Sequence, residues 1–412
     1  MERRRVVITG LGAVTPIGLT AKESWQAAKD GVCGIAPITQ FDPTGMKVHL
    51  AAEVKGFEPE NYMGKPEAKR MARFTQLAVV SAQEAMADAG FTLDEAEADR
   101  CGVIVSSGIG GLFLTEAEHD KGKEKGWDRV SPFYIPMGIC NMAAGQIAIH
   151  TGFRGMCSCP VTACTGGTNA VGDAFHYIRD GYADVMLCGG AESAVTPLAI
   201  GAFTSMRALT QNPDPNRASI PFDAERSGFV LGEGAAVLLL EELGHAQARG
   251  AQIYAEVVGY GATCDAYHMT APRPDGSGGA KAMEMALADG GVKPDEVDYI
   301  NAHGTSTPLN DASETTAVKA VFGDHAYQLA ISSTKSMTGH MLGAAGAVEF
   351  IVCVKTIQEG FIHATAGFRS AEEEMDLNYT PQAVKRQVRA AVTNSLGFGG
   401  HNGSLLVKKF ED

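Results

Sequence analysis

The sequence lacks the features of a secreted or membrane protein. Nothing at the N-terminus resembles a signal peptide, because MERRRVVITG runs directly into a strand-like segment. The longest apolar helical stretch, Met341–Val354, is too short to span a bilayer and contains Glu349. No low-complexity tract or flexible linker divides the 412 residues. We therefore expect a cytoplasmic protein with no membrane insertion.

The chain also lacks metal-ligand spacing among its nine cysteines. Cys157 and Cys159 form a C-x-C without a partner pair, so we expect no zinc site. Six others lie in apolar surroundings, typical of small buried side chains: Cys33, Cys101, Cys140, Cys188, Cys264 and Cys353. Such usage suits a reducing compartment.

Positive charge is scarce. The chain has 34 Lys and Arg against 48 Asp and Glu, a net charge of −14, and no Lys/Arg block. This balance argues against a nucleic-acid partner.

Strand-like and helical patterns alternate along the chain, which indicates α/β layers with largely buried sheets. The length exceeds one ordinary core, so two half-units are expected, residues 1–250 and 251–412. Candidate strands are Arg5–Thr9, Gly102–Ser106, Asp184–Cys188, Ala235–Leu240, Tyr254–Gly259, Val297–Ala302, Leu329–Ser332, Ala390–Ser395 and Ser404–Lys408. Candidate helices are Thr20–Asp30, Phe74–Ala89, Cys164–Asp180, Lys281–Ala288, Ala312–Phe322 and His340–Glu359. Each half opens with a β-segment ending in a similar turn, VVITGLGAV and VVGYGAT.

The remaining cysteine, Cys164, lies in VTACTGGTNA between an apolar segment and a helical pattern. The positive end of a helix favours a thiolate, and small neighbours leave backbone N–H groups free for an oxyanion. The setting favours a nucleophile over a structural cysteine.

Two histidines lie in loops rich in Gly, Thr and Ser: His303 in NAHGTSTPLND and His340 in SSTKSMTGHMLGAAG. His303 follows a buried strand and so projects into a site. Thr305 and Thr307 place two hydroxyls in the same loop. His340, at a helix start, is expected to stay neutral and donate through Nε2–H.

The three segments together resemble the active-site motifs of the β-ketoacyl-acyl carrier protein synthases, nearest to the elongating type II enzymes. RRVVITGLGAVTPIG, PFDAERSGFVLGEGAAVLLLEE, VVGYGATCDAYHMTAP and NSLGFGGHNGSLLVKKF resemble the same family, so the resemblance covers nearly the whole chain. It implies the thiolase fold, a duplicated five-layered α-β-α-β-α sandwich. The segment from about residue 110 to 149 is expected to cap the acyl tunnel and meet a second subunit.

The resemblance implies a role for each matching residue. Cys164 takes the acyl chain, and His303 and His340 stabilise the enolate left when the malonyl thioester loses carbon dioxide. Lys335 orients the histidines, with Glu349 behind it, and Phe398 in GFGG gates the tunnel. The implied substrate-binding residues are Ile109, Thr270, Thr305, Thr307 and Gly399. Two positions depart from the family pattern, Thr165 and Leu396.

The implied partners are acyl carrier protein, loaded with acyl or malonyl groups, and a second copy of the chain. Basic residues expected to dock the acidic carrier are Lys65, Lys69, Arg70, Arg129 and Arg207, with Arg73 in the same cluster as the first three. No metal or organic cofactor is implied, although a structural monovalent cation is compatible with the family.

Two alternatives remain beside this reading, and two further classes are disfavoured. A polyketide ketosynthase shares all three catalytic segments, and a chain-length factor shares the fold but lacks the cysteine. A biosynthetic thiolase needs a second cysteine near the C-terminus, and none follows Cys353. The initiating condensing enzyme has Asn where this chain has His340.

Overall fold

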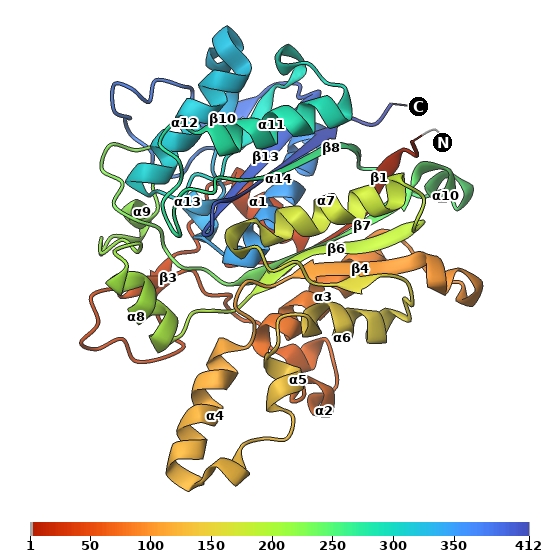
Figure 1. Cartoon of the computed structure of the whole chain (residues 1–412), viewed down its shortest axis with the longest axis vertical. Helices are drawn as coiled ribbons and strands as arrows, with labels where there is room; N and C mark the ends of the chain where they lie inside the picture. Colours follow the sequence, from red (N-terminus) through yellow and green to blue (C-terminus); the bar gives the residue numbers. More distant parts are fainter. Residues whose placement is uncertain (1–2, 412) are drawn as a thin grey trace.

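The computed structural model describes residues 3–411, which form one mixed ten-stranded sheet with helices on its faces (Figure 1). Its strands are β1 (Val6–Val14), β4 (Cys101–Ser106), β5 (Cys157–Ser158), β6 (Val185–Glu192), β7 (Gly234–Glu242), β8 (Ala255–Cys264), β9 (Tyr299–Asn301), β10 (Ala330–Ser332), β13 (Ala390–Gly397) and β14 (His401–Lys408). Two further two-stranded antiparallel sheets pair β2 (Ala36–Pro37) with β3 (Leu50–Ala51), and β11 (Phe361–Ile362) with β12 (Val384–Lys385).

The strand order repeats itself in the two halves of the chain. Along the sheet it runs β5-β4-β6-β7-β1 and then β8-β14-β13-β9-β10, so each strand of the first half has a counterpart in the second. Both halves have two antiparallel pairings followed by two parallel ones. The halves join where Val6–Ile8 of β1 pairs with Ala255–Val257 of β8. The expected duplication is therefore present in the topology.

Helices make three layers around the two half-sheets. They are α1 (Ala21–Lys29), α2 (Lys65–Ala68), α3 (Arg73–Asp88), α4 (Leu112–Lys125), α5 (Tyr134–Gly138), α6 (Met142–Thr151), α7 (Gly166–Arg179), α8 (Pro197–Ser205), α9 (Pro215–Ala218), α10 (Leu243–Ala248), α11 (Ser277–Gly290), α12 (Pro308–Phe322), α13 (Lys335–Thr338) and α14 (Ala345–Glu359). Helices α3 and α6 cover the first half-sheet, α11 packs on the second with α12 against it, and α7 and α14 contact each other between the halves (Figure 1). This is the expected five-layered arrangement.

The glycines of VVITGLGAV and VVGYGAT lie inside strands, so the prediction of a turn at each is wrong. A Cβ on Gly10 or Gly12 of β1 would come within 2.1 Å or 1.9 Å of a backbone oxygen of α3. Gly259 and Gly261 of β8 stand in the same relation to α11, at 2.0 Å each. Glycine is needed here because a helix backbone lies directly on the strand.

Two helices begin later than predicted. Helix α14 starts at Ala345, not His340, because Gly339 and Leu342 have left-handed φ angles of 61° and 46° and His340 forms an extended bridge with Leu231. Helix α7 starts at Gly166, after a 3₁₀ turn over Ala163–Thr165. His340 therefore lies outside a helix, and Cys164 lies in the turn just before one.

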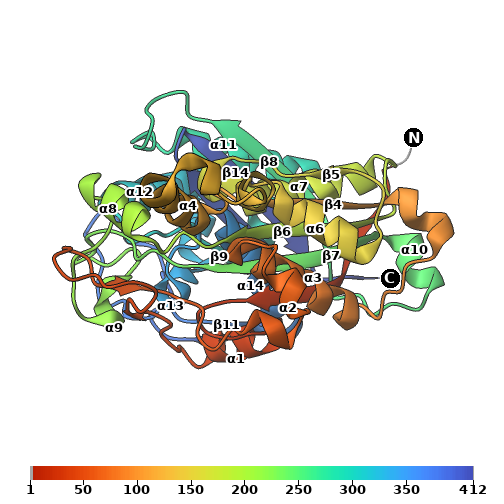
Figure 2. The same ribbon diagram turned by 90° about the horizontal axis from the view of Figure 1, so that it is seen from below.

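The segment expected to be a cap divides into two parts. Helix α4 and the following turn project from the body as an arm, whereas α6 packs on α3 and β4 (Figure 1). Both termini lie at the end of the molecule that carries α10, and α8 and α9 lie at the other end (Figure 2). No helix among the described residues is long and apolar enough to cross a membrane.

Candidate active site

A cavity of about 730 Å³ brings together most of the predicted site residues. Its walls come from both halves, through the loops that follow β4, β9 and β13 and the turn before α7. Predicted residues that line it are Ile109, Cys164, Arg207, Thr270, His303, Thr305, Thr307, His340, Leu396 and Phe398. Gly399 is not among the lining residues, and its N–H donates to the Met269 carbonyl over 2.8 Å.

Cys164 is buried, with 8% of its surface exposed, and sits one turn before α7. The preceding Ala163 has a left-handed φ of 50°, a conformation that costs a non-glycine residue energy and is concentrated at functional sites. Burial raises the pKa of the Cys164 thiol to about 11, against the lowering effects of Lys335 and the Phe398 backbone N–H. The helix end was expected to favour the thiolate, but the pKa of the Cys164 thiol is raised because desolvation is the larger effect.

His303 and His340 lie next to each other in the wall of the cavity. Their ring centroids are 5.3 Å apart and nearly perpendicular, and both rings are buried. Burial is the first cause that holds the pKa of each imidazole well below its usual value, and the Lys335 charge lowers both further. Both histidines are thus neutral at pH 7, as predicted for His340, although burial rather than a helix end is responsible.

Lys335 and Glu349 form a buried ion pair behind the histidines. Lys335 Nζ lies 2.5 Å from Glu349 Oε1, and the two side chains are only 1% and 2% exposed. Neither residue lines the cavity. Lys335 therefore acts on the histidines through its charge.

Two carboxylates that sequence reasoning missed hold the His303 loop. Glu314 accepts the backbone N–H groups of His303 and Gly304, both over 2.8 Å, and Asp311 accepts that of Thr305 over 3.0 Å. Burial raises the pKa of Glu314 to about 7. A signal was available, since the two acids lie three residues apart at the start of the helix that follows the loop.

Aromatic side chains surround the Phe398 segment, and sequence reasoning missed these as well. Phe203 lies 6.4 Å from Phe398 and 5.4 Å from Phe229, measured between ring centroids. Phe229 in turn stands edge-on to His340 at 5.3 Å. These rings connect the predicted gate to the histidines. Phe203 comes from a segment without a quoted motif, whereas Phe229 lies in PFDAERSGFVLGEGAAVLLLEE.

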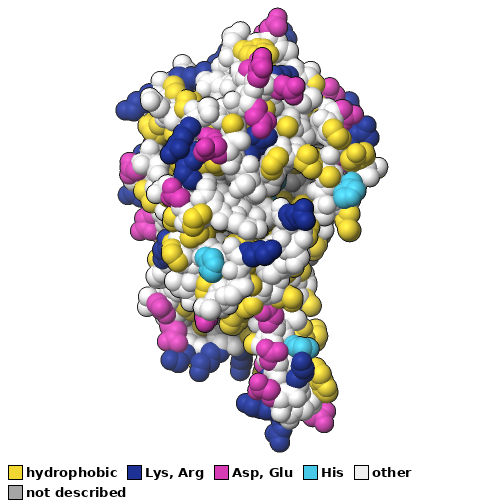
Figure 3. Space-filling view, turned by 90° about the vertical axis from the view of Figure 1, so that its left-hand side faces the viewer, with side chains coloured by type: hydrophobic (Ala, Val, Ile, Leu, Met, Phe, Trp, Pro, Cys, Tyr) yellow, Lys and Arg dark blue, Asp and Glu magenta, His cyan; other side chains and the backbone are white. Residues whose placement is uncertain are grey.

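The predicted docking residues are exposed, with one exception. Lys65, Lys69, Arg70, Arg129 and Arg207 lie on the surface. Arg73 was predicted to belong with them, but this is wrong: its guanidinium turns inward to the buried Glu233 at 2.8 Å. Figure 3 shows Lys and Arg side chains at the lower edge of the body, at the tip of the arm and in the middle of the face.

Cation-binding groups are few. The described part of the chain holds no cluster of three or more His, Cys, Asp or Glu side chains suited to a metal ion. Among residues 3–411, two buried oxygens near the Lys335–Glu349 ion pair have no hydrogen-bond partner. They are Asn301 Oδ1 and Glu349 Oε2. Both residues lie beside Cys353. Hard oxygens of this kind fit a monovalent cation.

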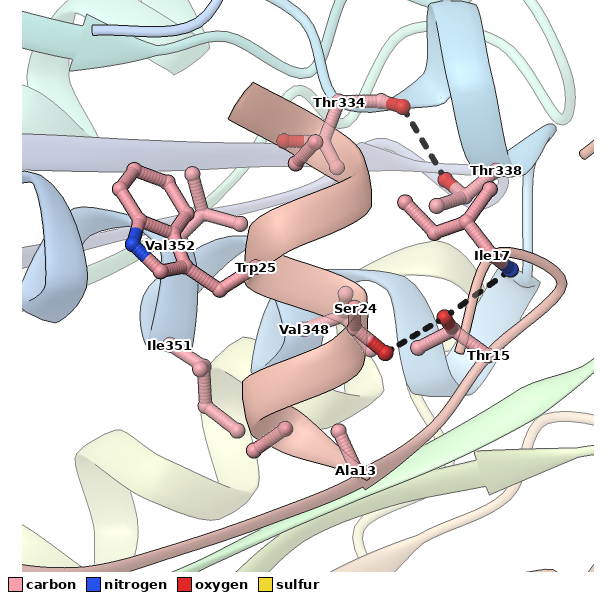
Figure 4. Close-up of a pocket in the computed structure, with 12 residues that line it drawn as sticks. Ala13, Thr15, Ile17, Ser24, Trp25, Thr334, Thr338, Val348, Ile351 and Val352 are labelled. Atoms are coloured by element: carbon pink, nitrogen blue, oxygen red, sulfur yellow. Dashed lines mark hydrogen bonds between the residues drawn. The ribbon is translucent and has the colours of Figure 1, made fainter. Parts of the chain in front are cut away.

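A second cavity lies on the far side of the Lys335 segment, between α1 and α14 (Figure 4). At about 10 Å³ it has room for about one water. Thr15 and Ser24 hydrogen-bond across its edge at 2.8 Å. It is too small to be a ligand site.

The layered fold and a buried cysteine facing two neutral histidines define an acyltransferase of the condensing-enzyme class. The sequence matches the Beta-ketoacyl synthase, N-terminal domain over residues 3–246 and the Beta-ketoacyl synthase, C-terminal domain over residues 254–369. The chain therefore belongs to the beta-ketoacyl synthase family.

The similarity to known proteins extends over the full length of the chain. The chain is 50% identical over 413 residues to 3-oxoacyl-[acyl-carrier-protein] synthase 2 of Synechocystis sp., covering 100% of this chain and 99% of that one. It is 49% identical over 411 residues to the Staphylococcus aureus (strain COL) protein of the same name, with the same coverage. A solved Beta-ketoacyl synthase from Burkholderia phymatum matches with a TM-score of 0.92 and 34% identity, covering 99% of this chain and 100% of that chain. A ketosynthase solved with its type II PKS acyl-carrier protein, bound to the hexaketide, matches at 0.91 and 33%, with the same coverage.

Proposed function

We propose that the protein is an elongating 3-oxoacyl-[acyl-carrier-protein] synthase. It would condense an acyl group held on Cys164 with malonyl-acyl carrier protein and release carbon dioxide. The main observation in support is that the Cys164 thiol and two buried, neutral imidazoles line the same cavity. The identity of about 50% to the two synthases over the whole chain supports the same assignment.

In the first step the Cys164 sulfur attacks the acyl-carrier thioester. Because the thiol is protonated at rest, its proton passes to one of the two neutral imidazoles as the C–S bond forms. The backbone N–H groups of Cys164 and Phe398 would hold the oxyanion. The imidazole returns the proton to the leaving carrier thiol, so the acyl-enzyme forms without net proton uptake.

In the second step malonyl-carrier enters the same cavity. His303 and His340 donate hydrogen bonds to its thioester carbonyl, which stabilises the enolate left when the C–C bond to carbon dioxide breaks. The enolate carbon attacks the Cys164 thioester, the 3-oxoacyl-carrier is formed, and the cysteine sulfur leaves as a thiolate, which takes up one proton from solvent to restore the thiol. Neutral imidazoles suit this task because they can donate without themselves titrating near pH 7.

The carrier and a second copy are the proposed partners. The exposed Lys65, Lys69, Arg70, Arg129 and Arg207 would receive the acidic carrier around the cavity. A homodimer is supported by large exposed apolar side chains beyond the sheet edge formed by β5. They include Phe133, Ile135 and Ile149, which are 50%, 63% and 71% exposed.

We also propose residues 1–250 and 251–412 as the two structural units. If a monovalent cation binds, Asn301 and Glu349 would hold it.

The test is an assay with acyl-carrier substrates of graded length, followed by intact-protein mass spectrometry. One acyl group per chain is expected, on Cys164, and malonyl-carrier should then give a 3-oxoacyl product two carbons longer. Repeated extension of one unreduced chain would favour a polyketide ketosynthase instead. Binding without acylation would favour a chain-length factor.

A further inference from the structure

Glu192, the last residue of β6, is a buried carboxyl that the steps above do not use. It accepts hydrogen bonds from the Ser107 hydroxyl at 3.0 Å and from the backbone N–H groups of Gly108 at 2.8 Å and Ile109 at 3.1 Å. A fourth comes from the N–H of Gly343 at 3.1 Å. Each oxygen thus takes two donors, and no Lys or Arg contact with Glu192 is recorded in the described structure.

The two segments that Glu192 joins belong to different halves of the chain. Residues 107–109 follow β4 and bring Ile109 to the cavity wall. Gly343 comes three residues after His340, directly after Leu342, which has a left-handed φ of 46° and also lines the cavity. One carboxyl therefore ties the wall beside Ile109 to the turn that carries His340.

The contact between residues 107–109 and the turn that carries Gly343 leaves no free space. A Cβ on Gly343 would come within 2.7 Å of the Gly108 nitrogen and 3.0 Å of Glu192 Oε2. A Cβ on Gly190 would come within 2.1 Å of the Gly343 oxygen. Because the segments touch, a shift of one displaces the other.

We infer that Glu192 is a positioning residue. It fixes the wall segment at Ile109 relative to the turn that carries His340, and so sets acyl-chain selectivity together with decarboxylation. The inference rests on the proposed function and adds a selectivity determinant to it. A buried carboxyl that served only stability would not need to bind both the wall and the histidine turn.

Glu192→Gln tests the inference with an isosteric change. With its NH₂ group in place of Oε2, glutamine leaves the N–H groups of Gly108 and Gly343 unpaired. With NH₂ in place of Oε1 it leaves the N–H of Ile109 unpaired, while the Ser107 hydroxyl can turn to accept. The preference of kcat/KM for the best acyl length over the next longer one should fall at least about threefold. Malonyl decarboxylation should fall about tenfold, because His340 loses its fixed position.

Two further variants separate positioning from stability. Ser107→Ala removes one donor on the wall side, so it should flatten the chain-length profile. Because the two segments touch, it should also lower malonyl decarboxylation, and both effects should be smaller than in Glu192→Gln. Glu241→Gln is the matched control, since Glu241 is equally buried and bonded to Thr9, His245 and Arg249 at a different site. It should lower the melting temperature and leave the profile unchanged.

The inference is overturned if folded Glu192→Gln keeps the wild-type profile and decarboxylation rate, or if Glu241→Gln flattens the profile equally. If Glu192→Gln does not fold, Ser107→Ala decides: a wild-type profile contradicts the inference and a flattened one supports it. Failure of the wild-type protein to condense at all would reject the proposed function instead.

Discussion

The two halves of the chain share a strand order but carry different chemistry. The first half presents a cysteine in the turn before α7, and the second presents a histidine in the segment before α14. Ile109, on the cavity wall, also belongs to the first half, whereas Lys335 and Phe398 belong to the second. A duplicated scaffold thus supplies two equivalent places for side chains, and different residues fill them.

The segments that carry the cysteine and the histidine meet because glycines allow the N-terminal ends of α7 and α14 to come into contact. A Cβ on Gly167 of α7 would lie 2.8 Å from the Gly343 oxygen, and one on Gly346 of α14 would lie 2.1 Å from Thr168 Oγ1. The close contact brings both helix N-termini to one cavity. We propose that the halves divide the reaction: the first half holds the acyl group and the second half makes the enolate.

The largest effect is expected from Cys164→Ala, which removes the first half's only proposed acyl acceptor. Condensation should fall by about three orders of magnitude or more. Intact-protein mass spectrometry after incubation with acyl-carrier should find no added acyl group. Acylation that persists in this variant would sink the nucleophile assignment.

His303→Ala and His340→Ala should each lower malonyl decarboxylation by at least about two orders of magnitude, because each removes a donor to the developing oxyanion. Acylation of Cys164 should survive better than condensation, since the other imidazole can still take the thiol proton. Release of carbon dioxide at the wild-type rate would mean that the substituted histidine is structural.

Lys335→Met should destabilise the second half by about 3–5 kcal/mol, because it leaves Glu349 buried without its partner. The double variant Lys335→Met/Glu349→Leu should recover part of that loss. Lys65→Met is the control: its pair with Glu60 is exposed, so its loss should cost less than about 1 kcal/mol. Urea unfolding measures all three, and equal losses for Lys335→Met and Lys65→Met would contradict the account.

Phe398→Ala should lower condensation more than acylation, because the ring lines the cavity together with Phe203, which packs beside it. The acylation rate, the condensation rate and a melting curve are measured together. An unchanged ratio of the two rates with a large drop in melting temperature would make Phe398 a packing residue only.

The smallest effect is expected at the surface. Lys65→Glu/Lys69→Glu should raise KM for acyl-carrier and flatten its salt dependence, since this attraction is screened over about 10 Å at 0.1 M salt. Short acyl-pantetheine analogues, which lack the carrier surface, should react as before. If both substrate types suffer equally, the lysines do not dock the carrier.

The sequence predicted what local chemistry determines. The strand and helix alternation, the duplication and the cavity positions of Cys164, His303 and His340 all agree with the structure. Errors arose where tertiary contacts override local preference. The strand glycines were predicted to be turns because the sequence pattern does not show that the backbones of α3 and α11 pack directly on them. Arg73 was predicted to be a surface base because its partner, the buried Glu233, lies 160 residues away in the sequence.

Electrostatics was the other source of error. The thiolate expected for Cys164 followed from the helix end alone, whereas burial, which one sequence does not reveal, raises its pKa to about 11. The roles of Glu192, Asp311 and Glu314 also depend on backbone N–H groups brought together by folding.

The division of labour between the halves is tested most directly by measuring both steps in two variants, Cys164→Ala and His303→Ala. Acyl loading is read by intact-protein mass and decarboxylation by carbon dioxide released from malonyl-carrier. The account predicts opposite losses: Cys164→Ala keeps decarboxylation and loses loading, whereas His303→Ala keeps loading and loses decarboxylation. Loss of both steps together in both variants would contradict it.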